Sequence, residues 1–110
     1  MGVVWLKSQC LDDFEGDVDF VERLVHSVLS YLQETVSKIE QKYQQSDLAE
    51  VRKLAHFLKG PSQQLHFQRL FKITQQLERS AQSGQVEQSL ILQLKKESEQ
   101  LAAVLRDFLD

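Results

Sequence analysis

The sequence predicts an all-α fold: an antiparallel up-down-up-down four-helix bundle with a short extra helix at the N-terminus. Helix breakers are scarce, with four glycines and one proline in 110 residues, whereas glutamine, leucine, glutamate and lysine are abundant. Apolar residues recur at three- and four-residue spacing through four long segments, and no segment has the alternating pattern of a strand. The connections between these segments are short, and long helices joined in this way pack most simply as antiparallel neighbours.

The N-terminal part is predicted to form a short amphipathic helix over Val3–Lys7. An acidic segment, Asp12–Asp17, follows and is interpreted as a turn that offers helix-capping side chains. The first long helix is expected to begin near Asp17 or Asp19 and to end at about Tyr43. Its apolar positions are Val18, Val21, Leu24, Val25, Val28, Leu32, Val36, Ile39 and Tyr43.

The second long helix is expected after a break at Gln44–Ser46. Asp47 and Glu50 form the pattern of a capping box, in which two side chains satisfy free backbone N–H groups at the start of a helix. At about 100° of rotation per residue, one side of this helix is apolar and faces the core. That side comprises Leu48, Val51, Leu54, Ala55, Leu58, Ser62 and Leu65.

Two further helices complete the predicted bundle. The third runs from about Phe67 to Ser80, and a turn at Ser83–Gly84 follows it, because glycine readily adopts the left-handed conformation that ends helices. The fourth runs from about Val86 to Leu109.

Composition and charge limit the classes of function. The chain is 42% hydrophobic and 26% charged, which suits a single domain over residues 1–110. A net charge of −3 argues against a nucleic-acid-binding protein, and the one cysteine, Cys10, excludes an internal disulfide. No apolar run approaches the roughly 20 residues that cross a bilayer, and the N-terminus lacks a signal pattern. We therefore expect a soluble, intracellular, monomeric protein. Its expected location is the cytoplasm, and the nucleus is also allowed. Because the short chain has its own Met1, it is expected to be free-standing.

No metal or cofactor site is expected. The three histidines, His26, His56 and His66, lack the i,i+4 spacing of a helical zinc site. No Gly-rich phosphate loop with its lysine is present, so the chain is not expected to bind and split ATP. His26 falls on the polar side of its helix and is expected to be exposed.

His56 lies nearly opposite the apolar side of the second long helix, so we expect its ring to face water. Arg52, Lys59 and Gln63 share its strip of the helix, one or two turns away. Gly60 leaves a notch beside the imidazole, although glycine inside a helix costs roughly 0.5–1 kcal/mol relative to alanine. An exposed helical histidine usually has no function, but a notch at this position is what close approach of another molecule would need.

The pattern His56-x-x-Lys59-Gly60-x-Ser62-x-x-Leu65 resembles the histidine-containing phosphotransfer domains of multistep phosphorelays. An Asp-rich turn and Asp19-Phe20-Val21 precede it, and Leu77-Glu78 follows at the expected distance. The run His56-Phe57-Leu58-Lys59-Gly60 is most similar to the fungal and plant-type free-standing members. The resemblance extends from about Asp12 to Glu78 in pattern, and to the C-terminus in helix order.

The resemblance implies that His56 accepts a phosphoryl group from a receiver-domain aspartyl phosphate and passes it to the aspartate of a response regulator. The expected partners are the receiver domains of a hybrid sensor histidine kinase and of that response regulator. Lys59 would neutralise the phosphoryl charge, and Gly60 would admit the receiver. Residues expected near the phosphate are Arg52, Gln63 and Glu78, of which Glu78 would orient His56 or remain an ordinary solvated glutamate.

Phe20 and Leu24 lie at the edge of the apolar stripe of the first long helix. The family pattern places such residues beside the histidine, so we expect them to contact the receiver. The alternative is that both are ordinary core residues, because helical apolar spacing alone predicts burial.

The sequence departs from the family pattern at two positions. Pro61 stands where a small polar residue is usual, and proline inside a helix removes a hydrogen bond, so a kink near Gly60-Pro61 that could turn Lys59 away from His56 is expected. His66 stands where glycine commonly ends the helix, and histidine tolerates the left-handed conformation better than most residues. Two alternatives therefore stay open: a protein that binds receivers without carrying phosphate, and a plain helical adaptor.

Overall fold

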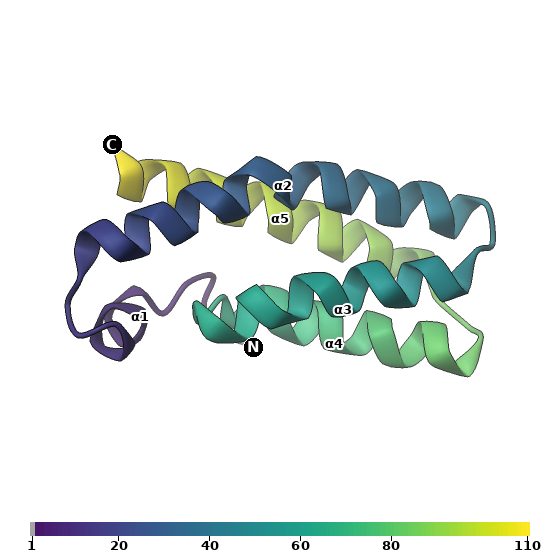
Figure 1. Cartoon of the computed structure of the whole chain (residues 1–110). Coiled ribbons are helices and arrows are strands. Elements are labelled where there is room, and N and C mark those ends of the chain that lie inside the picture. The colour runs from purple at the N-terminus through teal and green to yellow at the C-terminus, as the bar shows by residue number, and fades with distance from the viewer. Residues whose placement is uncertain (1) are drawn as a thin grey trace.

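Residues 2–110 of the chain are described in a computed structural model, and within this range the chain forms five helices and no strand. Helices α2 to α5 form an antiparallel up-down-up-down bundle, as predicted (Figure 1). Neighbours in the chain are neighbours in space, and α5 closes the ring by packing against α2 as well as α4. The bundle measures 42 × 20 × 20 Å. The helices are α1 (Lys7–Asp13), α2 (Val18–Gln44), α3 (Leu48–Gln64), α4 (Gln68–Ser83) and α5 (Gln88–Leu109).

The predicted caps open the two helices on which the candidate site depends. The Asp17 carboxylate accepts a hydrogen bond from the backbone N–H of Phe20 at 3.1 Å, and α2 starts at the next residue. The Asp47 carboxylate accepts one from Glu50 N–H at 3.2 Å at the start of α3. These side chains satisfy N–H groups that the first turn of a helix cannot pair.

Aliphatic side chains from all four long helices fill the core, as their spacing predicts. The fully buried members include Val21, Val25, Leu32 and Ile39 of α2, Val51, Ala55 and Leu58 of α3, Leu70 and Leu77 of α4, and Leu94, Leu101 and Leu105 of α5. None of the helices in the described range is long and apolar enough to cross a membrane.

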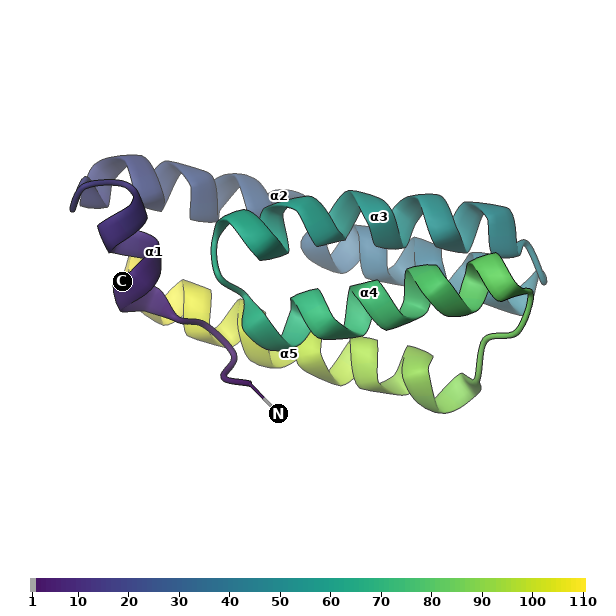
Figure 2. The ribbon, with the colours of Figure 1, turned by 90° about the horizontal axis from the view of Figure 1, so that it is seen from below.

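The helix predicted over Val3–Lys7 is wrong, because Lys7 alone of these residues is helical and α1 continues from it to Asp13. The preceding segment is anchored to the α3–α4 corner (Figure 2). The Trp5 indole N–H donates to Leu65 O at 2.8 Å, and Leu6 N–H donates to His66 O at 3.0 Å. These long-range bonds hold the segment against the corner in a non-helical course, and the Trp5 ring is buried in the core.

The acidic turn is also shorter than predicted. Asp12 and Asp13 belong to α1, and the reversal before α2 is made by residues 14–16. Glu15 and Gly16 take positive φ angles of 57° and 76° there. Glycine at the second of these positions has no Cβ to clash with the left-handed backbone.

The α3–α4 connection keeps its geometry despite both departures from the family pattern. His66 has φ 63°, the left-handed conformation expected for this position, and its ring is paired with the Asp13 carboxylate. Pro61 does not break the helix, because α3 is continuous from Leu48 to Gln64. The later boundaries shift by a few residues: α4 runs to Ser83 before Gly84 at φ 87°, and α5 starts at Gln88.

Candidate functional site

His56 projects from the middle of α3 on the side away from the core. Its side chain is 68% exposed. The adjacent Ala55 and Leu58 are buried, so the apolar stripe that anchors α3 holds the imidazole at the surface. His26, by comparison, is exposed on α2 and makes no side-chain hydrogen bond within the described chain. Both histidines are therefore exposed, and they differ in whether their rings have side-chain hydrogen-bond partners.

Glu78 of α4 contacts both His56 and Lys59. One carboxylate oxygen, Oε2, lies 2.8 Å from His56 Nδ1, and the other, Oε1, lies 2.6 Å from Lys59 Nζ. His56 and Lys59 are neighbours on one face of α3, and antiparallel packing brings α4 alongside them. The Glu78 side chain is 16% exposed, so most of it is shielded from water where α4 packs on α3.

Glu78 is ionised in this arrangement. The hydrogen bond from Lys59 is the main cause that lowers the pKa of Glu78. Burial is the next effect and opposes it, and the bond to His56 adds to the lowering. An ionised carboxylate accepts hydrogen bonds and cannot donate one, so Nδ1 of His56 must carry the hydrogen. A neutral ring then has its lone pair on Nε2, which makes no hydrogen bond within residues 2–110.

Gly60 leaves open space next to His56. Among the described residues, a Cβ added at Gly60 would meet no atom within 4 Å, and the residue lies in ordinary helix. Neither packing nor backbone conformation therefore requires glycine here. The surface beside Gly60 is therefore open to solvent.

Pro61 does not turn Lys59 away from His56, because both side chains share the Glu78 carboxylate. Arg52 and Gln63 are exposed on α3 and make no side-chain hydrogen bond in the described range. The structure therefore places them along the face of His56 and outside the contacts made by Glu78.

Phe57, the residue after His56, and Phe20, at the start of α2, are exposed aromatic side chains. Phe57 is 52% exposed and packs against Tyr31 of α2 with ring centroids 5.1 Å apart. Sequence reasoning did not select Phe57 as a contact residue, although its position at the margin of the apolar stripe was a usable signal. Phe20 is exposed at the start of α2 and packs on Phe14 at 5.4 Å, whereas Leu24 is half-buried against the core.

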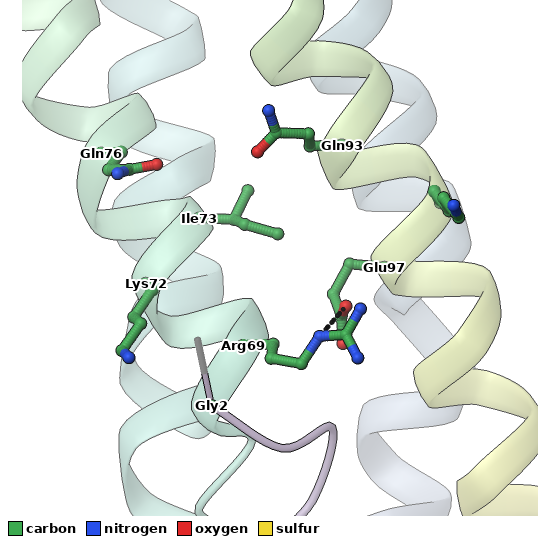
Figure 3. Close-up of a pocket in the computed structure, with 8 residues that line it drawn as sticks. Gly2, Arg69, Lys72, Ile73, Gln76, Gln93 and Glu97 are labelled. Carbon is green, nitrogen blue, oxygen red and sulfur yellow. Dashed lines mark ion pairs between the residues drawn. The ribbon is translucent and has the colours of Figure 1, made fainter.

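A separate groove of about 430 Å³ lies between α4 and α5, and none of the predicted site residues lines it (Figure 3). Its wall includes an ion pair between Arg69 Nε and Glu97 Oε1 at 2.9 Å. Burial raises the pKa of Glu97 although Arg69 opposes the shift, and its Oε2 has no hydrogen-bond partner within the described chain. The sequence analysis did not identify this buried carboxylate. Among residues 2–110 there is no group of three or more potential metal-ligating side chains.

Comparisons with known proteins agree with the fold. No curated protein matches the chain. The HPT domain from the Hpt sensor hybrid histidine kinase of Shewanella is a similar solved structure, with a TM-score of 0.86 at 21% sequence identity. The alignment covers 96% of this chain and 93% of that one. The family model described as the Hpt domain matches residues 23–104, a range that contains His56, Lys59, Gly60 and Glu78. Because this match spans most of the sequence, the chain belongs to the Hpt domain family.

Proposed function

We propose that this protein is a phosphorelay intermediate that carries a phosphoryl group on Nε2 of His56. Membership of the family supports phosphotransfer in general. The observation that supports His56 as the carrier is its contact with Glu78, which binds Nδ1 at 2.8 Å and leaves Nε2 free and exposed. A neutral imidazole with a free lone pair is a competent nucleophile near neutral pH.

In this proposal the phosphoryl group arrives from an aspartyl phosphate of a sensor-kinase receiver domain. His56 Nε2 attacks phosphorus, the P–O bond to the donor aspartate breaks, and the donor leaves as a carboxylate. The reverse reaction on a response-regulator aspartate passes the group on. The chain would act as a carrier in this relay and depend on its partners for phosphate.

Lys59 is positioned to compensate the charge of the bound phosphoryl group. Its ammonium is partly buried and already lies beside the imidazole through their shared contact with Glu78. Charge-assisted hydrogen bonds to phosphate are stronger than neutral ones. Arg52 and Gln63, which are exposed on the same face, would contact the phosphate or the receiver as it approaches over Gly60.

The docking surface in this proposal consists of Phe20, Leu24 and Phe57. Apolar side chains at the centre of an interface contribute most of its binding energy, and exposed aromatic residues are enriched among them. We propose that one such surface serves both receivers, with residues 1–110 acting as one monomeric domain in the cytoplasm or the nucleus.

Phosphate transfer from a charged receiver tests this proposal. A receiver phosphorylated by its kinase or by acetyl phosphate is mixed with wild type, His56→Gln and the matched control His26→Gln. Acid-labile, alkali-stable label on wild type and on the His26 variant, and none on the His56 variant, is the expected result. Histidine phosphate has this stability profile, whereas aspartyl phosphate is labile in alkali.

The two alternative functions predict different results. Receiver binding without label would indicate a protein that docks receivers and carries no phosphate. Partner binding that is unaffected by His56→Gln, again without label, would indicate a helical adaptor.

A further inference from the structure

We propose that Glu78 sets the pH range in which the protein can give up its phosphoryl group, by holding a proton on Nδ1 of phosphorylated His56. This inference rests on the proposed function, since it concerns the phosphorylated form. It assigns the Glu78 carboxylate a role that a neutral hydrogen-bond acceptor in its place would not fill.

The leaving group explains why this proton matters. When the phosphoryl group moves to an acceptor carboxylate, a new P–O bond forms, the Nε2–P bond breaks, and its electron pair returns to Nε2. If Nδ1 carries a proton, the ring leaves as neutral imidazole. If it does not, the ring must leave as imidazolate, a far stronger base and a much poorer leaving group. Transfer therefore requires the Nδ1 proton to stay in place.

The geometry keeps that proton on the ring throughout the cycle. Before phosphorylation, Nδ1–H donates to Glu78 Oε2 at 2.8 Å. After Nε2 bonds to phosphorus, the same proton gives the ring a positive charge next to the carboxylate. Opposite charges at this distance favour the charged form of both groups. No proton has to move when phosphate arrives or departs.

The other groups around the ring do not replace Glu78. On α3, Lys59 lies beside it and Arg52 is one turn earlier, and both cations disfavour a protonated ring. On α2, the neutral Tyr31 packs against Phe57, the residue after His56. Residues one turn from Glu78 on α4 are uncharged: Thr74, Gln75, Ala81 and Gln82. Among the described residues, Glu78 is the carboxylate that contacts the imidazole.

Two substitutions should therefore have opposite effects. Glu78→Gln keeps a side chain of the same shape with an oxygen that can accept from Nδ1, but it removes the negative charge. The phosphorylated ring should then lose its proton at a lower pH. Lys59→Gln removes the cation that shares the carboxylate, so Glu78 should hold the ring proton to a higher pH. A purely structural role for Glu78 would leave the pH at which the ring loses its proton the same in Glu78→Gln as in wild type.

The size of the effect follows from the charge. An adjacent opposite charge changes a proton affinity by about tenfold or more, and Lys59 offsets part of this. We expect the wild-type transfer rate to be similar to that of Glu78→Gln at about pH 6. At about pH 8.5 wild type should be roughly threefold to tenfold faster.

The experiment uses the full chain, phosphorylated through a receiver domain. Phosphorus NMR of the phosphohistidine is recorded across the pH range for wild type, Glu78→Gln and Lys59→Gln. Transfer to a fresh receiver is timed for wild type and Glu78→Gln in the same buffers, and circular dichroism checks that each variant is folded. The proposal predicts that the phosphorylated ring of Glu78→Gln loses its proton at a lower midpoint pH than that of wild type, and that the ring of Lys59→Gln loses it at a higher one. It also predicts that the ratio of the wild-type transfer rate to the Glu78→Gln rate grows with pH.

If wild type and Glu78→Gln are both phosphorylated on His56 and their rings lose the proton at the same midpoint pH, this inference is overturned and the proposed function stays intact. Failure of wild type to acquire phosphate would instead refute the proposed function itself.

Discussion

The Arg69–Glu97 ion pair should respond very differently to the loss of each partner. Glu97 is 2% exposed and holds one oxygen without a hydrogen-bond partner in the described chain, whereas the Arg69 side chain is 35% exposed and borders the α4–α5 groove. Arg69→Met leaves a carboxylate buried without its cation. Glu97→Met leaves a guanidinium that water can reach, and replaces the carboxylate with an apolar side chain of similar length.

The magnitude follows from these burial values. Removing one partner of a buried ion pair costs about 3–5 kcal/mol, and replacing the buried charge with an apolar group is often neutral or stabilising. Because the groove admits water near Arg69, we expect Arg69→Met to lower the free energy of unfolding by about 2–4 kcal/mol, or roughly 10–20 °C in Tm. Glu97→Met should change it by less than about 1 kcal/mol.

The loss of stability caused by Arg69→Met should also depend on pH. Burial raises the pKa of Glu97 above its value in the unfolded chain, so the folded state binds this proton more readily. The contribution of Glu97 to stability is therefore most favourable at low pH, and it falls as pH rises from the unfolded value, about 4.3, to the folded one. Without Arg69, which opposes the shift, the fall should be larger.

Urea denaturation of both variants at about pH 7 and about pH 4.5 measures these effects. Arg69→Met should recover much of its lost stability at the lower pH. Arg69 also donates to Gln100 at 3.1 Å on the surface, so Gln100→Ala controls for that bond and should cost less than about 0.5 kcal/mol. Equal losses from Arg69→Met and Glu97→Met, or a loss independent of pH, would refute this reasoning.

Three further predictions concern the surface and the α3–α4 corner. Phe20→Ala and Phe57→Ala should each weaken receiver binding, measured by titration calorimetry, by more than about 1 kcal/mol, and the far-UV circular dichroism spectrum should stay unchanged. Loss of helicity together with binding would argue against a docking role. His66→Ala should destabilise the fold more than His66→Gly in urea melts, because alanine keeps a Cβ at φ 63° and both lose the pairing with Asp13; the reverse order would contradict the left-handed conformation. Pro61→Ala should raise the free energy of unfolding, measured in thermal melts, by about 1–2 kcal/mol, because it restores a helix hydrogen bond and the greater freedom of the unfolded chain offsets only part of this gain. A decrease would show that the proline ring packs favourably.

Sequence patterns predicted the elements best where a local rule operates. The caps at Asp17 and Asp47 require only residues within one turn, and both carboxylates accept the expected N–H group. The second half of the predicted capping box is not formed, because Asp47 N–H donates to Lys42 O and the Glu50 carboxylate pairs with Lys53. The left-handed conformation of His66 was implied by the family resemblance, because the family commonly has glycine at this position. The helix predicted before α1 was wrong for the opposite reason. The Trp5 indole N–H donates to Leu65 O, sixty residues away in the sequence, and no local pattern contains that contact.

The sequence by itself determined the all-helical bundle and the exposure of His56, because periodicity specifies which side of each helix is apolar. Tertiary structure decided what contacts the exposed side. The packing of α4 on α3 brings the Glu78 carboxylate between His56 and Lys59, an arrangement that leaves Nε2 free. It also decided that Glu97 is buried beside Arg69 instead of lying on a solvated face. Helical spacing gives the direction of a side chain from its own axis, whereas its neighbours depend on how two helices pack and on their register.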